Sequence, residues 1–177
     1  ARAAGGGGVR AEAASNASRG ATGNAGGSHP LSRASRASSA IEGERAPLLE
    51  RWLLHRLFEL DRVVREAYRT YQFRDALSAI VEFCNVDLSA FYLDVRKDAL
   101  YCDTPSSLRR RACRTALDET FSRLTAWLAP ILPFTMEEAW LTRFPDSVSV
   151  HLRQFPETPA NWEDDFAGEE MARLREA

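Results

Sequence analysis

Apolar residues recur at alternating steps of four and three along the chain after Pro47. The stripe consists of Leu53, Leu57, Leu60, Val64, Ala67 and Tyr71. This spacing places one apolar face along an amphipathic helix, and a proline suits the first turn of a helix. We therefore predict a long helix that begins near Pro47 and ends at a short break between Tyr71 and Arg74.

The same pattern predicts two further long helices. The second follows this break, ends near Lys97 or Asp98, and carries Phe73, Leu77, Ile80, Cys84, Leu88, Phe91 and Val95 along one face. The third is expected to begin with Thr104 as its N-cap and Pro105 at its first helical position. Its inward residues are predicted to be Leu108, Ala112, Ala116, Phe121, Leu124 and Leu128.

Two prolines, Pro130 and Pro133, are expected to end or kink the third helix. Thr135 and Glu138 then form a capping-box pattern that predicts a fourth, shorter helix ending near Phe144. The alternation of apolar and polar residues in SVSVHLRQ, at positions 147–154, predicts an extended segment on the bundle. We predict an all-α, up-and-down helical bundle over residues 44–156, followed by an acidic tail over 157–177 that starts a truncated helix.

The beginning of the chain differs in composition from the rest. Among the first 40 residues, 32 are Ala, Gly, Ser or Arg and none is aromatic. Such a segment cannot bury enough apolar surface to offset the entropy lost on ordering. We predict that residues 1–43 form a disordered, low-complexity leader, although an Arg-rich, Ser-rich and acid-poor composition also describes an organellar transit peptide.

Charge and cysteine content narrow the classes of function. Residues 1–40 carry a charge of +4, residues 41–156 carry −1 and residues 157–177 carry −5. This balance lacks the overall basic excess of non-specific nucleic-acid binders, so any RNA contact must come from a local patch. Cys84, Cys102 and Cys113 form no CxxC pair and fit a reducing compartment. No apolar run approaches the roughly 20 residues that cross a bilayer, so we predict a soluble, cytoplasmic protein that does not enter a membrane.

No set of residues predicts catalysis. His29, His55 and His151 have no Cys, Asp or Glu at metal-ligand spacing. Glu137 and Glu138 are adjacent, and adjacent helical positions do not face each other. We therefore predict no catalytic residue, no metal ligand and no cofactor-binding residue in this chain.

Basic residues at the start of the third helix are the strongest candidates for a binding site. Arg110, Arg111 and Arg114 occupy neighbouring positions on a helix surface, where they could hold phosphates. The alternative is a solvated helix face that Asp118 partly neutralises.

Further candidates lie near the end of the second helix. Arg96 and Lys97 precede Asp98, and cations there also suit the helix dipole; Lys97 is the single lysine among 23 basic residues. Tyr92 and Tyr101 each lie among polar or charged residues and are predicted to be available for stacking on bases.

The candidate residues lie within a series of four sequence segments. FYLDVRKDALYCD, the arginine cluster, LAPILPFTMEEAW and SVSVHLRQFPETP follow one another between about Glu44 and Asp165. Together they resemble the anticodon-binding helical domain of class I isoleucyl-tRNA synthetases of the bacterial type. Leucyl and valyl synthetases share the bundle and the APxxPFxxEExW pattern, but RKDALYCD and the SVHL segment are more similar to the isoleucyl form.

This resemblance implies a function and a set of partners. The whole enzyme would join isoleucine to its tRNA with ATP and magnesium, and this bundle would dock on the anticodon stem and loop. The partners implied are isoleucine tRNA and the catalytic and C-terminal domains of the same enzyme, the latter binding zinc in many members. The RNA-binding residues predicted from the matching motifs and the arginine cluster are Arg96, Lys97, Tyr101, Arg110, Arg111 and Arg114.

The resemblance also implies what is missing. The chain has no HIGH-like or KMSKS-like signature, so we predict that it does not activate isoleucine by itself. The resemblance begins abruptly near Glu44. The residue types that dominate the preceding segment, Ala, Gly and Arg, all have GC-rich codons. Our preferred hypothesis is therefore that residues 1–43 are a non-native, out-of-frame or misassembled translation. The other two reading frames of the coding DNA would test it.

Two alternative functions stay open at this point. The chain could be the same domain of a valyl or leucyl synthetase. It could instead be a free-standing helical adaptor that binds protein, since Trp162, Phe166 and Met171 in the acidic tail have no evident partner in the sequence pattern.

Overall fold

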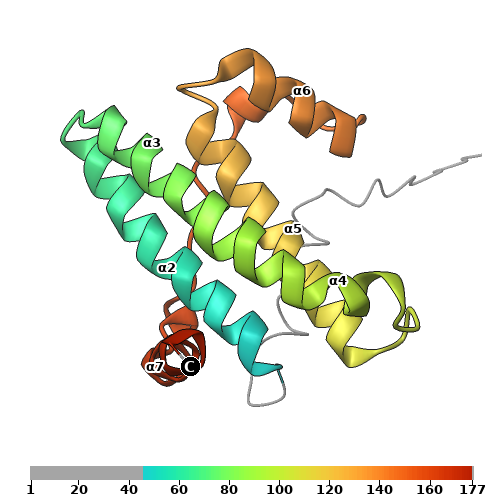
Figure 1. Ribbon diagram of the computed structural model, residues 1–177. Helices are drawn as coiled ribbons and strands as arrows, with labels where there is room; N and C mark the ends of the chain where they lie inside the picture. Colours follow the sequence, from blue (N-terminus) through green and yellow to red (C-terminus); the bar gives the residue numbers. More distant parts are fainter. Residues whose placement is uncertain (1–45, 177) are drawn as a thin grey trace, which may run out of the picture.

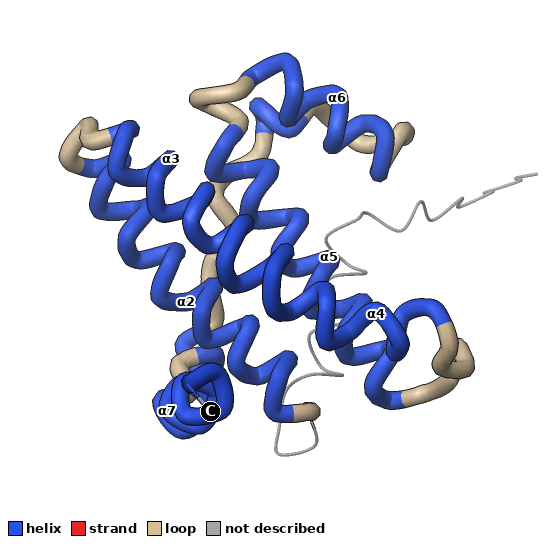
Figure 2. Tube along the Cα trace, in the orientation of Figure 1, coloured by secondary structure: helices blue, strands red, loops and turns tan. Residues whose placement is uncertain are grey.

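The computed structural model describes residues 46–176, and every regular element in this part of the chain is helical (Figures 1 and 2). The prediction of an all-α fold is therefore confirmed. The predicted leader, residues 1–43, lies outside the described residues. In order, the elements are α2 (Leu48–Arg69), α3 (Phe73–Glu82), the π-helical segment η1 (Phe83–Leu93), α4 (Asp94–Tyr101), α5 (Leu108–Leu128), α6 (Pro133–Arg143), the 3-10 turns η2 (Val150–Leu152) and η3 (Ala160–Trp162), and α7 (Asp165–Glu176).

The core lies along α2. In Figure 1, α2 and α3 run side by side in opposite directions, and α5 packs on α2 and α4. Leu53, Leu57 and Val64 have no exposed surface, which confirms the predicted stripe. Tyr71 does not continue it: this residue has a positive φ of 58° and is largely exposed, because the chain turns there from α2 into α3.

The second predicted helix is continuous from Phe73 to Tyr101, but its winding changes in the middle. The π-helical hydrogen bonds of η1 wind the chain more widely than an α-helix does. An apolar pattern counted with one α-helical period therefore loses its phase across η1. As a result Val95 is half exposed, whereas Tyr92 is fully buried. Tyr92 cannot stack on a base, so that prediction is wrong.

This composite helix also corrects the argument about membranes. By length and composition alone, the 29-residue helix from Phe73 to Tyr101 could cross a bilayer, since an 18-residue stretch within it has a mean hydropathy of 1.4. The sequence argument missed this because it counted only uninterrupted apolar runs. One such helix is weak evidence, since core helices of soluble proteins meet the same criterion. Here the helix packs on α2 and α5 and carries Asp87 and Arg96 in ion pairs.

The starts of the next two helices differ from the predictions. Ser107, not Thr104, is the N-cap of α5, and its hydroxyl accepts a hydrogen bond from the backbone N–H of Arg110. Helix α6 begins with Pro133 at its first position rather than at Thr135. Its predicted end at Phe144 is confirmed. Both prolines of the LAPILP segment lie between or at the ends of helices, as expected.

A smaller apolar cluster joins α6 to α5. Trp140 and Val150 are buried in it, and Phe121 and Phe144 pack against them. Glu137 accepts hydrogen bonds from the Val150 backbone N–H and the Ser149 hydroxyl, both at 2.9 Å, and so fixes η2. The predicted extended segment is therefore a 3-10 turn, in which Val150 alone of the alternating apolar residues is buried.

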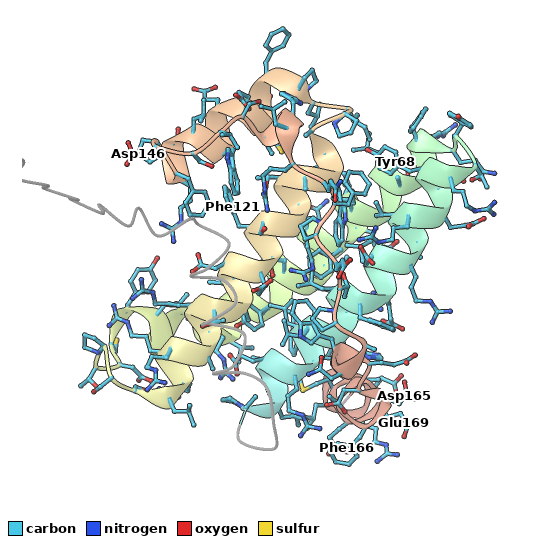
Figure 3. All side chains as sticks on the ribbon, turned by 180° about the vertical axis from the view of Figure 1, so that it is seen from behind. Tyr68, Phe121, Asp146, Asp165, Phe166 and Glu169 are labelled. Carbon is cyan, nitrogen blue, oxygen red and sulfur yellow. The ribbon has the colours of Figure 1, made fainter. Side chains whose placement is uncertain are left out.

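The acidic tail ends in α7, which lies across α2 (Figure 1). Trp162, Ala167 and Met171 are buried against the main core. Phe166 is on the outer side of α7 and is largely exposed (Figure 3). The tail thus contributes to the core of the bundle.

Candidate functional site

The predicted RNA-binding residues lie on α4 and on the first two turns of α5. These two helices contact each other and are joined by the turn at residues 102–107 (Figure 1). The fold therefore brings both candidate groups, RKDxLY and the arginine cluster, to one end of the bundle. Some of the predicted side chains at this end are exposed to solvent, and others are buried.

Four of these residues face solvent. Tyr101 is 85% exposed, and Lys97 is exposed with its ammonium group 2.9 Å from Asp94. The hydrogen bond to Asp94 raises the pKa of Lys97. Arg111 and Arg114 are exposed, and within residues 46–176 their guanidinium groups have neither a hydrogen bond nor an ion pair. These cations are free to meet an anionic partner.

The proposed neutralisation by Asp118 does not involve Arg114. Asp118 accepts a hydrogen bond from Arg143 of α6, at 2.9 Å. The ion pair ties α6 to α5 and leaves the charge of Arg114 uncompensated by that carboxylate. The alternative of a helix face neutralised by Asp118 therefore lacks the ion pair on which it depends.

Asp103 organises the turn between the two helices. Its carboxylate accepts hydrogen bonds from Arg109 Nε at 2.9 Å and from the Ser107 hydroxyl at 3.0 Å. Its backbone carbonyl accepts from Arg110 Nη1 at 2.5 Å. The hydrogen bond from Arg109 is the main reason why the pKa of Asp103 is lowered. Arg110 is thus partly occupied in holding the turn.

Arg96 points into the bundle rather than toward solvent. Its guanidinium group donates two hydrogen bonds to the carboxylate of Glu50, at 2.5 and 2.7 Å. Glu50 is fully buried in the first turn of α2 and also accepts a hydrogen bond from the Tyr92 hydroxyl, at 3.2 Å. Burial by itself lowers the pKa of Arg96, and the bonds to Glu50 outweigh this and raise it. Whether Arg96 reaches RNA stays a prediction.

Sequence reasoning missed Glu50, although a signal was present. Glu50 precedes Leu53 by three residues and Leu57 by seven, so it lies in register with the apolar stripe of α2. A carboxylate on such a stripe is expected to be buried and therefore paired, because an unpaired buried charge is costly.

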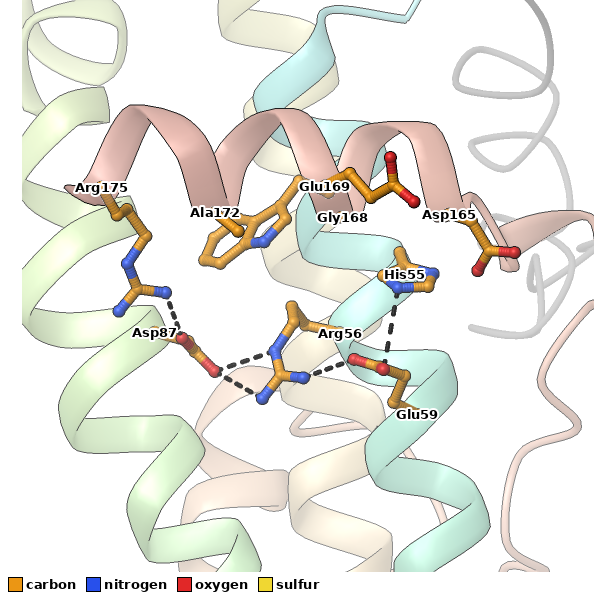
Figure 4. A pocket seen from close by; sticks show the side chains of 10 residues that line it. His55, Arg56, Glu59, Asp87, Asp165, Gly168, Glu169, Ala172 and Arg175 are labelled. Carbon is orange, nitrogen blue, oxygen red and sulfur yellow. Dashed lines mark hydrogen bonds and ion pairs between the residues drawn. The ribbon is translucent and has the colours of Figure 1, made fainter. Parts of the chain in front are cut away.

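A cleft of about 510 Å³ separates part of α7 from α2 and η1 (Figure 4). At its floor Asp87 pairs with Arg56, at 3.1 Å, and with Arg175, at 2.8 Å. His55 Nδ1 accepts a hydrogen bond from the Asp164 backbone N–H at 3.0 Å, so this histidine has a structural role. No group of His, Cys, Asp or Glu within residues 46–176 is arranged to hold a metal ion. The polar groups of the cleft link α7 to the bundle.

The described part of the chain is a helical bundle that carries exposed basic residues at one end. Residues 50–177 match the family described as "Anticodon-binding domain of tRNA ligase", and the chain belongs to this family. Among curated proteins it is 59% identical, over 129 residues, to an isoleucine--tRNA ligase of Brucella abortus biovar 1. It is 54% identical to that of Agrobacterium fabrum, also over 129 residues, and 55% identical to that of Caulobacter vibrioides over 128 residues.

These alignments cover most of this chain but little of the relatives. They include 73% of this chain in the Brucella and Agrobacterium comparisons and 72% in the Caulobacter one. The chain spans about 13% of the length of each of these relatives. The resemblance to the anticodon-binding domain of a synthetase is thus confirmed.

Proposed function

We propose that this chain is the part of an isoleucine-tRNA ligase that binds the anticodon stem and loop of isoleucine tRNA. The observation that carries the proposal is the exposed pair Arg111 and Arg114, whose charges no described residue compensates. Membership of the anticodon-binding family and the names of the relatives support it. Those names also favour the isoleucyl enzyme over the valyl and leucyl ones.

The predicted residues would act in two ways. Arg111, Arg114 and Lys97 would contact phosphates, since guanidinium groups bind them in a bidentate manner and an ammonium group acts as a point charge. Tyr101 would stack on an unpaired base of the anticodon loop, as exposed aromatic side chains do in many RNA complexes. The guanidinium group of Arg110 already donates one hydrogen bond to the Asp103 carbonyl and would add a phosphate contact at the edge of this surface.

The proposal extends to the whole enzyme. The catalytic domain of such a ligase would use ATP and magnesium to attach isoleucine to the tRNA, and the C-terminal region would hold zinc in those members that bind it. The partners of this bundle would be isoleucine tRNA and these two domains, in the cytoplasm. The residues described here would supply positioning of the tRNA and no chemical step.

The adaptor hypothesis has lost its main argument. It rested on Trp162, Phe166 and Met171 as apolar residues in need of a partner. Trp162 and Met171 are buried against α2 within this chain, and Phe166 alone remains exposed.

The test is binding of the 177-residue chain to isoleucine tRNA, beside the same tRNA with a changed anticodon. The proposal predicts tighter binding to the native anticodon. Equal affinity for both would mean that the bundle holds only the stem, and the absence of binding to either would contradict the proposal. The measurement is done at low and moderate salt, because phosphate contacts weaken as salt rises.

A further inference from the structure

Glu50 is the most deeply buried carboxylate whose role the sequence did not predict. Its residue surface is fully covered, although it lies in the first turn of α2. A buried carboxylate is retained at a cost in free energy unless partners compensate its charge. Here the partners are Arg96, which binds both carboxylate oxygens, and Tyr92, which donates through its hydroxyl.

These contacts link three helices at the basic end. Glu50 belongs to α2, Arg96 to α4, and Tyr92 to the last turn of η1. Cys113 of α5 is fully buried beside Tyr92, whose pKa is raised first by burial, then by the charge of Glu50 and by Cys113. The link therefore connects α2 with both helices that carry the predicted RNA-binding residues.

We propose that Glu50 is a positioning residue for RNA binding. Through Arg96 it holds α4 at a defined place beside α5, and this sets the distance between Lys97 and Tyr101 on one helix and Arg111 and Arg114 on the other. The inference rests on the proposed function, because it assigns a role to Glu50 only if this end of the bundle binds RNA.

The geometry of the contact suits this role. A bidentate guanidinium–carboxylate pair fixes orientation as well as distance, which a single contact does not. Arg96 directly precedes Lys97, and α4 forms the last eight residues of the continuous helix Phe73–Tyr101, so the pair ties the end of that helix to α2. Side chains already held in place lose less entropy when a partner binds.

A purely stabilising pair must be distinguished from a positioning one. The chain offers a matched control in Arg123 and Glu119 of α5. This pair is also buried, with an N–O distance of 2.5 Å, and Arg123, nine residues along α5 from Arg114, further contacts Thr158 and the Glu157 carbonyl. Glu119→Gln should therefore lower stability without altering the basic end.

The experiment compares the 177-residue chain with its Glu50→Gln, Arg96→Lys and Glu119→Gln variants. For each one, urea unfolding measures stability, and the Kd for isoleucine tRNA is measured at a temperature where the variant is folded. Glu50→Gln is expected to weaken tRNA binding by about tenfold, the effect of losing one contact to a charged group. Glu119→Gln is expected to leave Kd within about twofold at a comparable loss of stability. Arg96→Lys, which keeps the charge but not the bidentate geometry, is expected to fall between wild type and Glu50→Gln, and it serves as the test if Glu50→Gln does not fold.

A double variant makes the test specific. If Glu50 acts by positioning, Arg114→Ala should weaken binding less in the Glu50→Gln background than in the wild type, because the arginine is already misplaced. Equal affinity of Glu50→Gln and wild type, or an equal loss in Glu119→Gln, would overturn the inference while leaving the proposed function intact. If Arg114→Ala has no effect in the wild type, the assignment of a phosphate contact to Arg114 is wrong, whereas the absence of tRNA binding by the wild type would contradict the proposed function itself.

Discussion

At the scale of single residues, the account depends on which side chains are buried together. The burial of Leu53, Leu57 and Val64 could be predicted, because apolar spacing alone determines which face of α2 turns inward. The burial of Glu50 was missed because carboxylates are usually exposed, although its register with this apolar stripe was a signal. The burial of Tyr92 could not be predicted, because it results from the π-helical winding of η1, which leaves no simple periodic signal.

The buried Tyr92 hydroxyl predicts a loss of stability in alkali. Burial, and then the charge of Glu50, raise the pKa of Tyr92 far above its ordinary value of 10.0. At a pH above the ordinary pKa of tyrosine, the unfolded chain releases the phenolic proton while the folded protein keeps it. The free energy of unfolding therefore falls as the pH rises. The wild type should therefore lose more unfolding free energy than Tyr92→Phe between about pH 8 and about pH 11, measured by urea unfolding.

The control for this prediction is Tyr101→Phe, which removes a hydroxyl from a side chain that is 85% exposed. It should show the same alkaline loss as the wild type. An identical pH dependence of Tyr92→Phe and wild type would contradict the burial of this phenol next to Glu50.

At the scale of elements, the four amphipathic helices could be predicted, but the starts of α5 and α6 could not. Four amphipathic segments were expected and found as helices, because their apolar periodicity is strong. The start of α5 was misplaced because Thr104 and Pro105 carry a good N-terminal signal, yet the hydrogen bonds of Asp103 turn that stretch into a loop and leave Ser107 as the cap. Tertiary contacts of this kind are invisible to local patterns.

Helix α7 is held against α2 at a close approach that requires glycine. A Cβ atom at Gly168 would lie 3.0 Å from Nε2 of His55. The imidazole cannot easily yield, because its Nδ1 accepts the hydrogen bond from the Asp164 backbone at 3.0 Å. The absence of a side chain at this position therefore permits the packing that buries Ala167 and Met171.

This contact predicts the effect of Gly168→Ala. On a solvent-exposed helix surface the change would stabilise the protein by about 1 kcal/mol through helix propensity. Here we expect a net destabilisation of about 1 kcal/mol, because crowding of His55 outweighs that gain. Thermal unfolding measures it, with Ala172→Gly, at an exposed residue of α7 that lines the open cleft, as the propensity control. A rise in Tm of Gly168→Ala would show that α7 is not packed as described.

At the scale of the whole molecule, the fold gathers the basic residues of two separate motifs at one end of a nearly neutral bundle. The two motifs could be predicted from the sequence, and so could the class of fold. Which basic side chains are free and which are held in ion pairs could not be predicted, because this depends on the ion pairs of Arg96 with Glu50 and of Arg143 with Asp118. These pairs form between residues distant in the sequence.

The most direct test of the central claim is the salt dependence of isoleucine tRNA binding by the wild type and by Arg111→Ala plus Arg114→Ala. Each lost phosphate contact should reduce the slope of log K against log salt by about one, so the double variant should bind more weakly and with a slope smaller by about two. The matched control is Arg74→Ala, an exposed arginine at the start of α3, at the opposite end of the bundle (Figure 1). It should change neither affinity nor slope. An unchanged slope in the double variant, or an equal change in Arg74→Ala, would contradict the assignment of RNA binding to this end of the molecule.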